Sequence, residues 1–318
     1  MSEKAIPNSG FIRTVTGDNF SEDLGIILGH EHLITRPADH LLDEGDLLLN
    51  DETKSIKELS IFKEAGGGCV VELTTAEFGR DVFALRRISK ATGIAVVATT
   101  GHVAQEYWRD VIDVDSMDSV EMFEEMVQDL LVGFSGTAIK AGIIKAGSSK
   151  HEITPAENRI LKAAAKAQIH TGAPITTHTT AGTMAIEQAK ILLKAGANPD
   201  HVYLGHLDRD LNFDLHLNLL KMGFHLGYDC ASKEWYEPDS KRIQFILRFF
   251  ELGFGSRICL SGDLARRSSL TSWGGGPGYT HIPWRIIPWL RREGLQSEEI
   301  TQLTKNNLLQ LLRWQKNN

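Results

Sequence analysis

The sequence predicts an α/β fold, a closed (β/α)8 TIM barrel with a short N-terminal hairpin and an extra C-terminal helix. Short β-branched runs alternate along the chain with longer segments whose apolar residues recur every three or four positions. Eight such pairs fit within 318 residues, a length that one barrel accommodates. A doubly wound sheet is the alternative, but a His-x-His segment stands where that fold expects a glycine-rich phosphate turn.

The predicted strands are short runs rich in Val, Ile, Leu and Thr, and they cover residues 25–30, 69–75, 94–102, 138–145, 174–178, 202–206, 225–229 and 258–263. The predicted helices cover residues 55–65, 81–92, 119–131, 154–170, 181–195, 213–222, 240–252 and 282–292, with a closing helix at 298–314. Thr154, Pro155 and Glu157 give the fourth helix a capping-box start. Residues 10–20 predict the hairpin. No linker or composition break divides the chain, so we expect a single domain over residues 1–318.

Composition argues against several classes of partner. The formal net charge is -7 and no long Lys/Arg run occurs, so we expect neither nucleic acid nor an anionic membrane surface as a partner. No apolar stretch is long enough to span a bilayer, and residues 1–7 lack the apolar core of a secretory signal. Cys69, Cys230 and Cys259 lie far apart in apolar runs, which predicts buried reduced thiols and a cytoplasmic location.

The first predicted strand ends in two histidines, His30 and His32, that are one residue apart. Alternate residues of a strand point to the same face, so both imidazoles can reach one metal ion while Glu31 points the other way. The pattern by itself is weak, because a lone histidine at a strand end is more often a hydrogen-bonded structural residue. The pattern indicates a metal site only if other strands supply further ligands.

Four other predicted strands also end in residues that can bind a metal, namely Lys145, His178, His206 and Asp263. Each has a structural alternative: Asp263 could cap a helix, and Lys145 could pair with a carboxylate. In a barrel, however, the carboxyl ends of all strands meet at one mouth, where the chemistry of such enzymes gathers. Five strand ends with these residue types predict a metal site. Four imidazoles and a carboxylate exceed the needs of one catalytic zinc, so we expect two ions.

Two adjacent ions need a bridging anion, and Lys145 is the candidate. Burial and a nearby dication favour the neutral amine of a lysine. A neutral amine can capture carbon dioxide and become a carbamate, which offers two oxygen atoms as a bridge.

These segments resemble the phosphotriesterase branch of the amidohydrolase superfamily, and specifically the phosphotriesterase-related or phosphotriesterase-homology proteins. The resemblance runs nearly end to end through Gly29-His-Glu-His-Leu, Gly136-Thr-Ala-Ile-Lys-Ala-Gly-Ile-Ile-Lys, Thr176-Thr-His-Thr, Gly205-His-Leu-Asp-Arg and Gly262-Asp-Leu-Ala-Arg-Arg. The segment Gly274-Gly-Gly-Pro-Gly-Tyr-Thr-His-Ile resembles the related proteins more than the organophosphate-degrading enzymes. Some related proteins have a glutamate one residue further along strand four, but this chain has Ala146 there, which favours the lysine version.

The resemblance implies a binuclear site that usually holds zinc. It assigns the more buried ion to His30, His32 and Asp263, the more exposed ion to His178 and His206, and the bridging carbamate to Lys145. A hydroxide that bridges the ions would then be the nucleophile, because metal binding brings the pKa of water to about 7. Asp263 is the expected proton acceptor. Lys140 lies five residues before Lys145 and is expected to point away from the mouth.

Three further residues are expected near a substrate: His102 at the end of strand three, Arg209 after strand six and Tyr228 near the end of strand seven. Each has a structural alternative, since Arg209 could pair with Asp208 or Asp210 and Tyr228 could belong to the core. Arg266 and Arg267 could anchor the next loop, form surface salt bridges or meet an anionic substrate. The loop at residues 268–280 is long enough to shape specificity.

The predicted chemistry fits the hydrolysis of carboxylic esters or lactones, of amides and of phosphotriesters, and the fold does not choose among them. For a cytoplasmic enzyme with a small-molecule substrate we expect an ester or lactone, with phosphotriesters as a side activity. An N-acyl amide is the second choice. A binding protein whose metals only stabilise the barrel is the alternative from another class. A homodimer would use apolar helix positions, which are equally suited to packing on the barrel: Phe245, Phe249, Phe250, Trp284 or Trp289.

Overall fold

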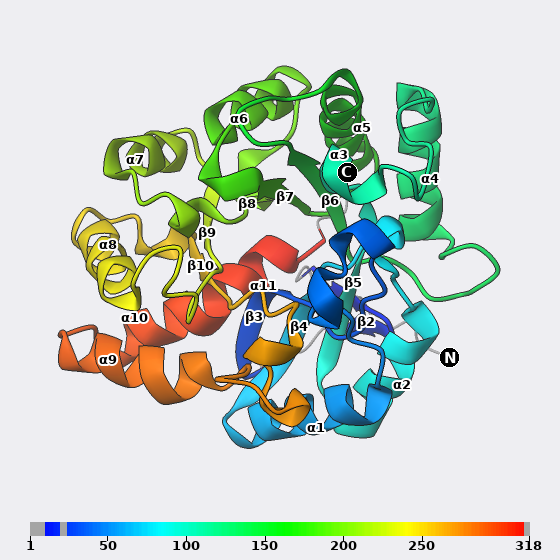
Figure 1. Ribbon diagram of the computed structural model, residues 1–318. Helices are drawn as coiled ribbons and strands as arrows, with labels where there is room; N and C mark the ends of the chain where they lie inside the picture. The colour runs from blue at the N-terminus through cyan, green and yellow to red at the C-terminus, as the bar shows by residue number, and fades with distance from the viewer. Residues whose placement is uncertain (1–9, 20–23, 315–318) are drawn as a thin grey trace, which may run out of the picture.

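The computed structural model describes residues 10–19 and 24–314, and it confirms the predicted barrel. Eight parallel strands follow one another in sequence order, and helices surround them (Figure 1). The strands are β3 (Ile26–Glu31), β4 (Gly67–Glu72), β5 (Ala95–Gly101), β6 (Ile143–Ser148), β7 (Ile175–Thr179), β8 (Val202–Leu204), β9 (His225–Tyr228) and β10 (Ile258–Leu260). Their carboxyl ends therefore open at one mouth.

The expected hairpin precedes the barrel. Strands β1 (Ile12–Thr14) and β2 (Gly17–Asn19) pair in antiparallel register. The hairpin contacts the other end of the described chain, because the guanidinium of Arg13 lies 4.2 Å from the ring centroid of Trp314. The first and last described segments thus meet on one side of the barrel.

The outer layer consists of α1 (Glu52–Glu64), α2 (Val82–Thr92), α4 (Ser119–Leu131), α5 (Pro155–Thr171), α6 (Ala185–Lys194), α7 (Phe213–Lys221), α8 (Asp239–Glu251) and α9 (Ile287–Arg292). The predicted capping box is present, since Thr154 accepts from the amide of Glu157 while Glu157 accepts from the amide of Thr154. Helix α5 then ends at Gly172, whose φ of 78° suits glycine. The short helix α3 (Gln105–Trp108) follows β5 and is not among the predicted elements.

The largest difference from the predicted elements is at the fourth barrel strand. The apolar run suggested residues 138–145, but β6 starts at Ile143 and continues past Lys145 to Ser148. A Cβ at Gly142 would lie 2.2 Å from the carbonyl oxygen of Arg13, so the chain first passes tightly under the hairpin. Lys145 is therefore inside the strand rather than at its end, and Lys140 lies before the strand.

The predicted helices at 282–292 and 298–314 are less regular than expected. Residues Ile282–Ile286 form a wide π-helical turn before α9, because Pro288 has no N–H for the carbonyl of Trp284. The closing helix comprises α10 (Ser297–Thr301), a second π-helical segment (Gln302–Asn306) and α11 (Asn307–Leu312). The closing helices lie across the ring of strands in Figure 1.

The seam between β3 and β10 is closed by a side chain. The hydroxyl of Ser261 accepts from the amide of His30 at 3.0 Å and lies 2.8 Å from the carbonyl oxygen of the same residue. Two residues after Ser261, the amide of Asp263 donates directly to the carbonyl of His30 at 3.0 Å. The seam thus joins two of the predicted ligands directly.

Two apolar layers support the barrel. The larger one lies between strands and helices, and the smaller one fills the barrel interior with Ile27, Val71, Ile143 and Cys259. Leucines of α11 complete the inner layer, which blocks the end of the barrel opposite the mouth. All three cysteines are buried and free, as predicted. Of the side chains considered for a dimer, Phe249 is buried in the outer layer and Trp284 is 59% exposed. In the described part of the chain, no helix has the length and apolar character needed to cross a membrane.

Candidate metal centre

The structure brings all six predicted metal ligands to one cavity of about 130 Å³ at the mouth. The Nζ atom of Lys145 lies 3.2 Å from Nε2 of His30, and Oδ1 of Asp263 lies 3.5 Å from the same nitrogen. The ring centroid of His206 lies 4.5 Å from that of His30 and 4.6 Å from that of His178. Donor atoms from five strands therefore face one small space, as the sequence predicted.

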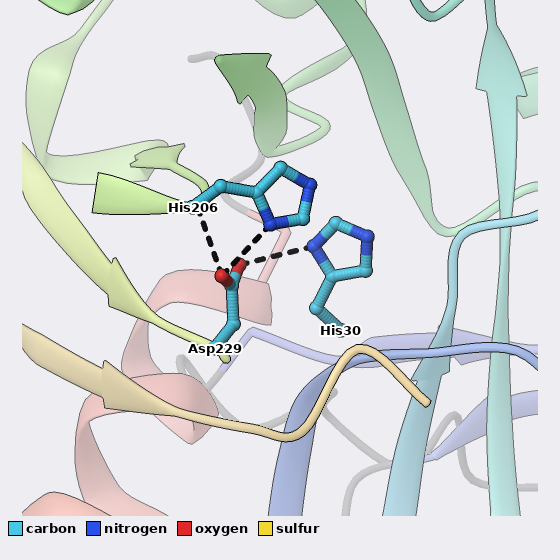
Figure 2. A group of neighbouring side chains, drawn as sticks. All are labelled: His30, His206 and Asp229. Carbon is cyan, nitrogen blue, oxygen red and sulfur yellow. Dashed lines mark hydrogen bonds and ion pairs between the residues drawn. The ribbon is translucent and has the colours of Figure 1, made fainter. Parts of the chain in front are cut away.

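One carboxylate, that of Asp229, holds two of these histidines (Figure 2). Its Oδ2 lies 3.1 Å from Nδ1 of His30, and its Oδ1 lies 2.9 Å from Nδ1 of His206. The hydroxyl of Tyr203 and the amide of His206 also donate to it. Because Asp229 accepts hydrogen bonds from both Nδ1 atoms, the lone pairs of both Nε2 atoms are left for a ligand.

A longer chain of hydrogen bonds orients His32. The hydroxyl of Thr74 donates to the carboxylate of Glu72 at 2.6 Å, so its oxygen accepts from Nδ1 of His32 at 2.8 Å. The Nε2 atom of His32 is then free and lies 3.3 Å from Oδ1 of Asp263. Glu72 thus fixes the tautomer of His32 through an intervening hydroxyl.

His178 has the opposite tautomer. The hydroxyl of Thr180 donates to the carbonyl of Ser148 at 2.8 Å, and its oxygen lies 3.1 Å from Nε2 of His178. That nitrogen therefore bears the proton, and Nδ1 is the ring atom left for a ligand. The four histidines offer a metal three Nε2 atoms and one Nδ1 atom.

Burial favours the neutral form of three of the imidazoles and of the Lys145 amine. Burial, together with the charge of Lys145, lowers the pKa of His30 to about 3. Burial also lowers the pKa of His32 and brings that of His178 well below its usual value. The pKa of Lys145 falls to about 8 through burial, although nearby carboxylates oppose the shift. Neutral imidazoles and a readily deprotonated amine are what metal ligation and carbamate formation need.

Asp263 is held as an anion in an unusual backbone conformation, with φ of 48°. Burial opposes its ionisation, but the ammonium of Lys233 and the neighbouring imidazoles outweigh burial and keep its pKa well below the ordinary value. Lys233 lies 2.5 Å from both Oδ2 and the carbonyl oxygen of Asp263. Only Oδ1 therefore faces the other ligands.

This donor set fits a divalent transition metal. His30, His32 and Asp263 have ligand atoms within 4.8 Å of one another, and His206, Cys230 and Asp263 form a second such group. Imidazoles with a carboxylate suit zinc and similar ions. The first group is the one that the resemblance assigned to the more buried ion. Cys230 was not among the predicted ligands, and burial raises the pKa of its thiol well above the usual value.

The three predicted substrate contacts differ in their placement. Arg209 lines the cavity, and its guanidinium lies 4.1 Å from the ring centroid of Tyr236. Its Nε is buried without a hydrogen-bond partner among the described residues. The expected alternative, a pair with Asp208, is not formed, because Asp208 binds Arg242 at 2.6 Å. Arg209 is thus a cation with unused hydrogen-bonding capacity at the mouth.

His102 and Tyr228 do not line this cavity, which corrects their expected position. His102 lies between the carboxylates of Glu77 and Glu125 at 3.4 and 3.3 Å. Burial lowers its pKa, but the two carboxylates outweigh burial and raise the value to about 10. The hydroxyl of Tyr228 lies 2.9 Å from Nδ1 of His216 on α7. Both side chains point outward from the barrel, toward the helix layer.

The loops around the mouth add residues that the sequence did not single out. Tyr107 of α3 lines the cavity, as do Trp235 and Tyr236 after β9. Trp235 is 62% exposed and packs edge-on against Tyr236. Arg266 also lines the cavity and pairs with Asp43 and Asp46, which anchors the loop after β10 as one alternative suggested. The guanidinium of Arg267 binds the carbonyl of Leu48 and the side chain of Asn50.

Comparisons with known proteins agree with this geometry. The family model of the phosphotriesterase family matches residues 10–312. The phosphotriesterase homology protein of Escherichia coli is 33% identical over 89% of this chain and 96% of its own. An N-acetyltaurine hydrolase of Dictyostelium discoideum is also 33% identical, over 84% of this chain and 75% of its own. A solved structure of a lactonase from Listeria monocytogenes has a TM-score of 0.91 at 33% identity, and the match covers 96% of this chain and all of that one. The chain thus belongs to the phosphotriesterase family, whose members are metal-dependent hydrolases, and it is a hydrolase.

Proposed function

We propose that the protein hydrolyses a carboxylic ester or lactone at a site with two divalent metal ions, most simply zinc. The observation behind this proposal is the convergence of His30, His32, His178, His206, Lys145 and Asp263 on one cavity. A purely structural zinc site is closed by four ligands, whereas this set faces a cavity large enough for small molecules. When bound, the ions would polarise the substrate and make water nucleophilic at neutral pH.

The protein's own groups have separable roles in this proposal. His30, His32 and Asp263 would hold one ion, and His178 and His206 the other. Asp263 would accept the proton of the attacking water at Oδ1, because Lys233 already occupies Oδ2. The carbonyl carbon then gains the water oxygen and loses the alkoxy oxygen, which takes up the proton from Asp263 and leaves as an alcohol or as the hydroxyl end of an opened lactone.

Lys145 is the proposed bridge, as a carbamate. Its amine lies 3.2 Å from Nε2 of His30, it lines the same cavity as the predicted ligands of both ions, and burial lowers its pKa to about 8. A Lys145→Ala variant should lose most activity and bind less metal, and short carboxylic acids should restore part of both by taking the place of the bridge. Wild-type metal content and turnover in this variant would exclude the assignment.

Arg209 is the proposed substrate contact. It is the cavity-lining arginine whose guanidinium forms no ion pair with a carboxylate of residues 10–19 or 24–314, whereas Arg266 is paired twice. We propose that it donates to an oxygen of the substrate beyond the scissile bond. The similarity to a solved lactonase supports the choice of an ester or lactone.

An N-acyl amide is the second candidate, supported by the similarity to an N-acetyltaurine hydrolase at 33% identity. Phosphotriester hydrolysis is proposed only as a side activity. The deciding experiment measures metal content and turnover on matched lactones, esters, N-acetyl amides and phosphotriesters. Two ions per chain with a preference for lactones or esters would support the first proposal. A preference for N-acetyl amides would replace it with the second, and turnover after complete metal removal would overturn both.

A further inference from the structure

The residue between the two histidines of the His-x-His segment has an unusual set of contacts. Glu31 is 1% exposed, and its side chain points away from the cavity into the seam between β3 and β10. Its Oε1 accepts from the amide of Gly262 at 2.7 Å, and its Oε2 accepts from the amide of Leu264 at 2.8 Å. The hydroxyl of Ser261 lies 2.7 Å from Oε1. One buried carboxylate therefore binds the residues on both sides of Asp263.

Asp263 needs such support because of its backbone. Its φ of 48° lies in the left-handed region, which few residues other than glycine adopt. Such a conformation persists only where the surroundings impose it. The two amides next to Asp263 donate to Glu31, and its own amide donates to the carbonyl of His30. The turn is thus fixed at three consecutive peptide groups by the strand end that also contains His30 and His32.

We propose that Glu31 is the positioning residue that sets Asp263 against His30 and His32, and so determines how tightly one of the two ions is held. This inference rests on the proposed function, in which these three residues bind a metal. The carboxylate has no contact with the reacting atoms. It acts by joining the third ligand to the segment that supplies the first two.

The chemistry of the contact requires a carboxylate of this length. Glutamine would retain one acceptor oxygen, but its NH2 group would face one of the two backbone N–H groups. Two hydrogen-bond donors would then point at each other, and one hydrogen bond would be lost. Aspartate is one methylene shorter and could not reach both amides, which lie on either side of residue 263. Alanine would leave two buried amides without a partner.

The test compares Glu31→Gln with the control Glu58→Gln. Glu58 is also buried, at 3% exposure, and also accepts a backbone amide of the segment after β10, that of Ser272 at 2.6 Å. It lies on α1 and contacts none of the predicted ligands. Loss of an outer partner of a metal ligand typically costs 10- to 100-fold in metal affinity or activity. We therefore expect roughly that loss of zinc affinity and of kcat in Glu31→Gln, with KM little changed, and neither loss in Glu58→Gln.

Two further measurements separate positioning from stability. Amide exchange at Leu264 should accelerate in metal-free Glu31→Gln but not in Glu58→Gln. Thermal unfolding should show comparable losses for the two variants. If Glu31→Gln lowers only the melting temperature and keeps wild-type zinc affinity and kcat, Glu31 is merely structural and the inference is overturned. An Asp263→Asn variant serves as the reference, because full metal content and turnover there would refute the proposed function itself. Loss in Asp263→Asn without loss in Glu31→Gln refutes only the inference.

Discussion

Replacing Asp229 by asparagine should remove one metal ligand without touching a ligand residue. Four nitrogen and oxygen donors converge on this carboxylate: the Nδ1 atoms of His30 and His206, the amide of His206 and the hydroxyl of Tyr203. Asparagine has one acceptor oxygen, which can keep both contacts of His206 on the Oδ1 side. Its NH2 group then takes the Oδ2 position. The hydroxyl of Tyr203 can rotate so that its oxygen accepts from this NH2 group. The Nδ1 atom of His30 can accept from it only if the ring proton moves from Nδ1 to Nε2.

That movement places the proton of His30 on Nε2, the atom that faces Lys145 and Asp263 in the cavity. A protonated nitrogen cannot ligate, so the ion held by His30 and His32 should bind more weakly. Such outer partners typically contribute 10- to 100-fold in metal affinity or activity, equivalent to about 1.4–2.7 kcal/mol. We expect at least a tenfold fall in affinity for one ion and in kcat/KM.

The assay is metal analysis after dialysis against a graded series of chelator concentrations, combined with kinetics at saturating zinc. The matched control is Asp129→Asn, which removes a buried carboxylate that accepts from Thr100 at 2.7 Å in the helix layer. The control should lose stability but keep its metal. Equal metal retention by wild type and Asp229→Asn would show that Asp229 does not set the tautomer of His30.

Three more predictions concern the surroundings of the site. Arg209→Gln should raise KM roughly 10- to 100-fold for substrates with an oxygen beyond the scissile bond, because a hydrogen bond to a charged group contributes about 1.5–3 kcal/mol. An unchanged KM would exclude the contact between Arg209 and the substrate. His102→Asn should destabilise the fold strongly below pH 6.5 and progressively less as the pH rises through about 10, because the pKa of His102 is raised in the folded state. Urea unfolding of wild type and variant at pH 6 and pH 10.5 tests this. An equal loss of unfolding free energy at both pH values would contradict it. Removing metal with a chelator should lower the melting temperature, and adding zinc back should restore it in a concentration-dependent way, whereas no shift would argue against specific metal binding.

Much of the fold and of the ligand set follows from local sequence patterns. The period of apolar residues locates the barrel strands and their helices, and the capping signals at Thr154 and Gly172 place one helix almost to the residue. The six predicted ligands share a cavity because parallel strands bring their ends together. These features depend on neighbours in the chain, and a single sequence is enough to see them.

The errors have a common physical cause, which is the two-residue period of a strand. His225, Gly227 and Asp229 face the barrel interior, so Tyr228 must face the helices, where it meets His216. Tyr228 therefore lies on the outer face of β9, and Asp229 lies on the face toward the metal ligands. The outward direction of His102 has the same origin. Counting alternate residues from the strand interior would have identified Asp229 as the inward residue.

Other features could not be predicted because they depend on contacts between distant segments. The late start of β6 comes from the tight passage of Gly142 beneath the hairpin. The pairing of Lys233 with Asp263, and of Arg209 with the ring of Tyr236, joins loops that follow different strands. Nothing in the local sequence indicates which loop residues will meet at the mouth.

The shared acceptor of His30 and His206 has a consequence for the order in which metal is taken up. In the proposed site these histidines bind different ions, yet both depend on the orientation of one carboxylate. The first ion to arrive would fix its histidine, and through Asp229 would also fix the other histidine before the second ion binds. The conformational entropy of ordering the two histidines is then lost when the first ion binds and not again when the second ion binds. Zinc uptake should therefore be cooperative, with few molecules holding a single ion at intermediate zinc concentrations.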